Sequence, residues 1–164
     1  MQKKRLVTGV AIVIILFIAI VASMFFVAKP VSAVRGDMEI KIGDTRITAQ
    51  VAHTEAEREK GLGGIDALYE HDGMFFIFDG PVFPSFWMKD MKIPIDIVWI
   101  SGGKVIGFEE NVDPEIGVTE LNLKLYKPSD FVNNVLELRA GAVRAFHINK
   151  GDEVITRPLS NKAQ

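Results

Sequence analysis

Lysine and aspartate side chains interrupt the apolar segment FWMKDMKIPIDIVWI, residues 86–100. Lys89 and Asp90 stand near its start, and Asp96 lies inside a stretch that is otherwise typical of a buried strand. A carboxylate can act as a general base while a lysine stabilises developing charge, so these residue types are compatible with hydrolysis or isomerisation. The same side chains could instead hold a polar ligand without any reaction.

Aromatic side chains accompany these charges. Phe86, Trp87 and Trp99, together with a few polar groups, give the composition expected of a small-molecule pocket. In this interpretation the lysine and the two aspartates form a polar cluster at the mouth of a pocket that the aromatic rings line. All six residues are therefore candidate ligand-binding residues.

A structural role for Asp96 is the competing interpretation. By strand alternation its side chain shares a largely apolar face, where an unpaired carboxylate is costly. We expect a turn at Lys89 and Asp90 to return the chain, so that residues 86–88 pair with residues 95–100. Lys89 or a backbone N–H of that turn would then reach Asp96, which would fix the turn by accepting hydrogen bonds.

Other catalytic and metal-binding patterns are missing from the sequence. It has no cysteine, and its three histidines, His53, His71 and His147, lack the i, i+4 spacing of a helical metal site. Gly102-Gly103-Lys104 precedes a predicted strand and is not followed by the serine or threonine of a phosphate-binding loop. We therefore predict no metal and no cofactor. A binding or interaction domain without catalysis is favoured over a small hydrolase or isomerase that uses Asp96 or Asp90 with Lys89.

Charge argues against nucleic acid as a partner. The chain has 19 basic and 21 acidic residues, and Lys3, Lys4, Arg5 and Lys29 lie in or beside an apolar N-terminal segment. Without those four, 15 basic residues remain against 21 acidic ones, a net charge of about −6. An acidic domain without a basic stripe is a poor match for a phosphate backbone.

The N-terminal segment predicts export. The 23 residues from Leu6 to Ala28 carry no charge and would span about 35 Å as a helix, enough to cross a bilayer. The preceding basic cluster predicts a cytoplasmic N-terminus and an outer C-terminal domain, tethered as a single-pass protein of the cytoplasmic membrane. The alternative is a signal peptide cleaved near Ala33, which would release the domain. The predicted partners are the membrane, through this helix, and a small polar ligand or an envelope protein.

Short segments bounded by glycine and proline dominate the rest of the chain. They predict a mainly β (α+β) domain, a small barrel-like or two-layer antiparallel sheet with one short helix, preceded by the transmembrane helix. The predicted strands cover residues 38–42, 46–51, 73–78, 85–88, 95–100, 104–108, 135–138 and 153–156. The helix covers residues 54–60, where Thr54 and Glu57 form a capping box, and a helical turn covers residues 142–147.

These elements divide the chain into five parts. The predicted boundaries are a cytoplasmic stub at 1–5, the anchor or signal segment at 6–28, a linker at 29–37, the β domain at 38–158 and a tail at 159–164.

The β domain resembles a prokaryotic family known as domain of unknown function 192, or uncharacterised protein family 0127, over about residues 40–157. The resemblance rests on the order and spacing of Glu57-Arg58, Gly61-Leu62, residues 73–78, 86–90, 93–97 and 103–105, Val135 to Gly141, and Gly151-Asp152. It implies an exported or membrane-tethered single domain with a barrel-like fold, and it supplies no activity or substrate. Two departures are Gly63-Gly64-Ile65, where relatives carry an arginine-bearing segment, and Asp90, where asparagine is more usual.

Overall fold

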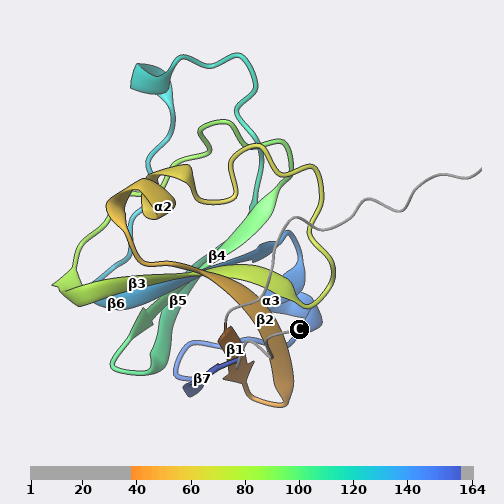
Figure 1. The fold of residues 1–164 in the computed structure, drawn as a ribbon, viewed down its shortest axis with the longest axis vertical. Coiled ribbons are helices and arrows are strands. Elements are labelled where there is room, and N and C mark those ends of the chain that lie inside the picture. Colours follow the sequence, from red (N-terminus) through yellow and green to blue (C-terminus); the bar gives the residue numbers. More distant parts are fainter. Residues whose placement is uncertain (1–37, 160–164) are drawn as a thin grey trace, which may run out of the picture. The chain divides into compact units, whose positions relative to one another are not determined.

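The computed structural model describes residues 38–159, which form a mainly β domain (Figure 1). Its elements are β1 (Met38–Ile42), β2 (Thr45–Ala52), α2 (Glu55–Lys60), β3 (Asp72–Val82), β4 (Ile95–Ser101), β5 (Lys104–Val112), the 3-10 helix η1 (Glu120–Asn122), β6 (Val132–Arg139), α3 (Ala142–Ala145) and β7 (Val154–Pro158).

The seven strands form one mixed sheet in the order β5-β4-β6-β3-β2-β1-β7. β2 and β3 run parallel, and the other neighbours run antiparallel. The two ends of the sheet also meet, because the Val105 N–H donates to the Asp152 carbonyl over 2.9 Å and the Val154 N–H donates to the Gly103 carbonyl over 2.8 Å. The sheet therefore closes into a small barrel.

Two clusters of buried side chains occupy opposite faces of this sheet. The first draws residues from all seven strands and from α3, so it fills the interior of the closed sheet. The second covers the outer face of β3, β4 and β6, where Leu62, Met88 and Met91 from the connecting segments pack against it. Successive side chains of β4 point to opposite faces, so Val98 belongs to the first cluster and Trp99 to the second. Figure 1 shows α2 beside this outer part of the sheet.

Most predicted elements are confirmed. β1 and β2 form a hairpin around Gly43, whose φ of +57° suits glycine. α2 has the predicted capping box, since Thr54 Oγ1 accepts from the Glu57 N–H and Glu57 accepts from the Thr54 N–H. The Thr54 N–H, followed by the His53 N–H, holds the pKa of the Glu57 carboxyl below its usual value.

Two details of the prediction are wrong. The sheet is not purely antiparallel, because the chain from β2 to β3 crosses over through α2, a connection that suits parallel strands. Residues 85–88 form no strand and contribute only an isolated bridge between Phe86 and Tyr126. The 3-10 helix η1 was also not predicted, whereas α3 falls within the helical turn predicted at residues 142–147.

No helix within residues 38–159 is long and apolar enough to cross a membrane. The predicted membrane segment at 6–28 lies outside the described residues.

Candidate ligand-binding site

Asp96 is completely buried, and backbone N–H groups satisfy its carboxylate. Oδ1 accepts from Asn111 over 2.7 Å and from Gly141 over 3.1 Å, and Oδ2 accepts from Val143 over 2.8 Å. Gly141 and Val143 lie at the start of α3, where free N–H groups need an acceptor. Through these hydrogen bonds Asp96 connects α3 and the end of β5 to β4.

The prediction that the Lys89–Asp90 turn supplies these hydrogen bonds is wrong. β5 and β6 occupy the two edges of β4, so residues 86–88 cannot pair with it. Lys89 instead forms ion pairs with Glu120, at 3.0 Å, and with Glu59, at 3.6 Å. The hydrogen bond to Glu120 raises the pKa of Lys89, and the negative charge of Glu59 adds to this effect.

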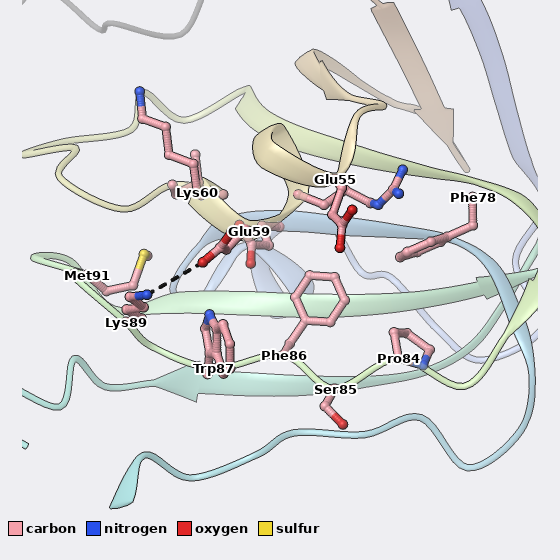
Figure 2. A pocket seen from close by; sticks show the side chains of 14 residues that line it. Glu55, Glu59, Lys60, Phe78, Pro84, Ser85, Phe86, Trp87, Lys89 and Met91 are labelled. Atoms are coloured by element: carbon pink, nitrogen blue, oxygen red, sulfur yellow. Dashed lines mark ion pairs between the residues drawn. The ribbon is translucent and has the colours of Figure 1, made fainter. Parts of the chain in front are cut away.

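A cavity of about 320 Å³, the α2 cavity, lies between α2 and the segment that follows β3 (Figure 2). Its size falls at the lower end of the range for small-molecule sites. The lining residues are Glu55, Arg58, Glu59, Lys60, Gly61, Leu62, Phe78, Pro84, Ser85, Phe86, Trp87, Lys89, Met91 and Glu137.

Glu137 of β6 is the buried polar residue of this cavity. It is 4% exposed and sits opposite Met74 and Ile97 in the neighbouring strands. The Leu62 N–H donates to its carboxyl group, but Oε2 has no hydrogen-bond partner within the described part of the chain. Burial raises the pKa of Glu137 to about 8, and the Leu62 N–H offsets this only in part. At neutral pH the group is therefore mainly a neutral acid.

The glycine-rich end of α2 shapes the cavity around Glu137. Gly61, with φ of +49°, ends the helix and places the Leu62 N–H at the carboxyl group. A Cβ at Gly63 would lie 2.9 Å from the Lys60 carbonyl oxygen, so a side chain there would force this turn apart. The Gly64 N–H then donates to the Asp90 carbonyl over 2.9 Å, which ties the turn to the Lys89–Asp90 segment.

Three aromatic side chains form the wall of the cavity. The Phe86 ring meets the rings of Phe76 and Trp99 edge to face, with centroids 4.9 Å and 5.5 Å away. These contacts fix its orientation, and Figure 2 shows the ring pointing toward α2. Phe78 and Trp87 complete the wall.

The rings of Phe78 and Trp87 each lie close to a positively charged side chain of the protein. The Arg58 guanidinium is 5.2 Å from the Phe78 ring centroid, and Lys89 Nζ is 5.7 Å from that of Trp87. Arg58 is further held by hydrogen bonds to the carbonyls of His53 and Ile77, the latter at 3.1 Å. Both cations are thus fixed in place at the rim.

The structure brings together only part of the predicted site. Phe86, Trp87 and Lys89 line the α2 cavity. Asp90 lines two neighbouring hollows that also contain Lys89. Asp96 and Trp99 line none of these three, since Asp96 belongs to the barrel side of β4 and Trp99, 2% exposed, packs behind Phe86.

Three residues of the cavity were not predicted as site residues from the sequence: Glu137, Arg58 and Phe78. A signal for Glu137 was present, because it is the single acidic residue in the apolar run Val135 to Leu138. Among residues 38–159 no group of three or more His, Asp or Glu side chains is arranged to hold a metal ion.

Fold and site together define a small, mainly β domain with an aromatic-lined, polar cavity on the outside of a closed sheet. The chain belongs to the DUF192 family, described as uncharacterized ACR, whose model matches residues 38–156. No curated protein gives a significant match.

Two solved structures share the fold. A protein of unknown function from Novosphingobium aromaticivorans DSM 12444 is 26% identical with a TM-score of 0.65, over 77% of this chain and 89% of that one. A protein from Sinorhizobium meliloti 1021, proposed as a transcription regulator, is 25% identical with a TM-score of 0.65, over 78% of this chain and 98% of that one.

Proposed function

We propose that this domain binds a small organic molecule in the α2 cavity and catalyses no reaction. The observation that carries the proposal is the Oε2 atom of Glu137, which is buried, has no partner among the described residues and belongs to a cavity-lining side chain. A buried polar atom without a hydrogen bond costs about 1 to 3 kcal/mol. A ligand that bonds to this atom would recover that cost.

The rest of the cavity supports the same function. Phe78, Phe86 and Trp87 offer apolar surface, and charged groups at the rim offer a few directional contacts. This combination is typical of sites for small molecules. The alternative enzyme needs Asp96 or Asp90 to work with Lys89. Its Asp96 version is disfavoured because both oxygens of Asp96 already accept backbone hydrogen bonds, and in either version Lys89 is already paired with Glu59 and Glu120.

We further propose that the domain works outside the cytoplasmic membrane, tethered by residues 6–28. The support comes from the uncharged length of that segment and from the basic residues before it. A tether would hold the cavity near envelope components, whether small molecules or an envelope protein.

Thermal unfolding of the full chain with a panel of sugars, nucleosides, amines, carboxylates and metal ions tests the proposal. A ligand at about a hundred times its dissociation constant should stabilise the protein by about 2.7 kcal/mol, a shift of about 10 °C in melting temperature for a domain of this size. The shift should disappear in Trp87→Ala. It should persist in Phe131→Ala, a control that removes an exposed ring outside the cavity.

Two results would overturn the proposal. One is a panel in which no compound shifts the melting temperature. The other is a ligand whose shift is the same in Trp87→Ala as in the parent protein, because that ligand would bind elsewhere.

A further inference from the structure

Most of the charged side chains around the α2 cavity either have a partner within the protein or point away from the aromatic wall. Figure 2 shows the Glu55 carboxylate next to Phe86, the Glu59 carboxylate directed at Lys89, and the Lys60 ammonium group pointing away from the aromatic rings. Arg58 and Lys89, held over the rings of Phe78 and Trp87, bring two positive charges against these two carboxylates. An ionic ligand would have to compete with the ion pairs of Lys89 with Glu59 and Glu120, whereas a neutral ligand would leave them intact.

The aromatic wall excludes a cationic ligand in particular. The rings of Phe78 and Trp87 would be the natural surfaces for a ligand ammonium group. Each of them already has a protein cation within 6 Å of its centroid. What the rings still offer is apolar surface for the flat, C–H-bearing face of a ligand.

The polar groups that line the α2 cavity favour a ligand that both donates and accepts hydrogen bonds. Glu55 and Glu59 accept, and Arg58 donates. The buried Glu137 carboxyl group needs a partner at Oε2, and as a neutral acid it donates there. Hydroxyl groups satisfy all of these requirements, because each one is a donor and an acceptor.

We infer that the ligand of the α2 cavity is a neutral, hydroxyl-rich ring compound, in the chemical class of a saccharide unit, whose ring contacts Phe86 and Trp87 and one of whose hydroxyl groups bonds to Glu137. The inference rests on the ligand-binding function proposed above. The cavity volume of about 320 Å³ limits the bound part of such a ligand to one or two sugar rings.

Fluorescence titration of the full chain tests the inference, because Trp87 lines the cavity whereas Trp99 is buried behind it. The neutral probes are glucose, N-acetylglucosamine, maltose, cellobiose and chitobiose. The charged probes are glucosamine, a cation, and glucuronate, an anion. At least one neutral probe should bind saturably, and its dissociation constant should change little with salt, since screening acts only on charged partners.

Variants connect this binding to the proposed contacts. Isothermal titration calorimetry measures the variants, because Trp87→Ala lacks the fluorescent reporter. Trp87→Ala should weaken binding at least about tenfold, and Phe131→Ala should leave it unchanged. Glu137→Gln should weaken it less than about threefold, because an amide still donates and accepts, whereas Glu137→Leu, which does neither, should weaken it at least about tenfold. Circular dichroism shows which variants fold. If Glu137→Leu does not fold, the affinities of Trp87→Ala and Glu137→Gln test the proposed contacts.

Three outcomes would overturn the inference. Binding of only glucosamine or only glucuronate would show that the cavity selects charge. A ligand from the broader panel that is not a sugar, and that depends on Trp87, would refute the saccharide class and leave the ligand-binding function standing. Equal loss of sugar binding in Glu137→Gln and Glu137→Leu would contradict the proposed hydrogen bond, because glutamine can donate and accept at this position whereas leucine can do neither.

Discussion

Glu137 should make the protein less stable as the pH rises, and Glu137→Gln should remove this dependence. The unfolded chain releases the Glu137 proton near pH 4.5, whereas burial in the folded domain delays release to about pH 8. Between these values the folded state binds more protons than the unfolded state, so the free energy of unfolding falls with rising pH. The contribution is fully present below pH 4.5 and is lost by about pH 8.

The size of the effect follows from the two pKa values. Each unit of difference corresponds to about 1.4 kcal/mol, so raising the pH from 5 to 9 should cost the parent protein about 4 kcal/mol through this one group. Glutamine has nearly the same shape and cannot ionise. The stability of Glu137→Gln relative to the parent should therefore rise by the same amount over this range.

Urea denaturation followed by tryptophan fluorescence at pH 5, 7 and 9 measures these differences. Glu153→Gln is the matched control, because it removes one carboxylate from an exposed position. The reasoning is refuted if the stability difference between Glu137→Gln and the parent is equal, within about 1 kcal/mol, at pH 5 and pH 9.

Three further substitutions test the account of the fold. Asp96→Ala leaves the buried Val143 N–H and the partly buried hydrogen-bond donors of Asn111 and Gly141 without their acceptor, and it should lower the free energy of unfolding by about 3 kcal/mol in urea denaturation; a loss below about 1 kcal/mol would contradict its role at α3. Gly73→Ala should cost about 1 to 3 kcal/mol, because the new Cβ would lie 2.7 Å from the Glu137 carbonyl oxygen. Gly80→Ala, in the same strand with nothing within 4 Å of its Cβ, is the control and should melt like the parent. Thr54→Ala should lose about 1 kcal/mol through the capping box, and an unchanged melting temperature would show that α2 does not depend on it.

Local sequence signals predicted most of the elements. The hairpin around Gly43 and the capped helix α2 depend on residues close together in the chain, so their patterns suffice. The parallel pairing of β2 with β3 depends on where the chain returns after α2, which the strand patterns do not contain. Residues 85–88 look like a strand because three of the four are apolar, yet Phe86 and Trp87 form the wall of a cavity and Met88 packs in the outer cluster.

The two buried acids show why the site was only partly predictable. Asp96 and Glu137 give the same sequence signal, a single carboxylate in an apolar strand. Neighbours distant in sequence decide their roles: three backbone N–H groups satisfy Asp96, whereas Glu137 receives one and keeps Oε2 unpaired within the described residues. The aromatic candidates Phe86 and Trp87 were found because they lie beside Lys89 and Asp90 in the sequence.

The position of β1 has a mechanical consequence. β1 lies between β2 and β7 and pairs with each of them over its full length, from Met38 to Ile42, in antiparallel register. A force applied to the chain before Met38, along the strand, would load the hydrogen bonds on both sides of β1 together in shear, and they would resist as a group instead of opening one after another. In a domain held by its N-terminal end, the load would thus enter the sheet through a strand that is paired on both sides, and not through an edge strand that could peel away.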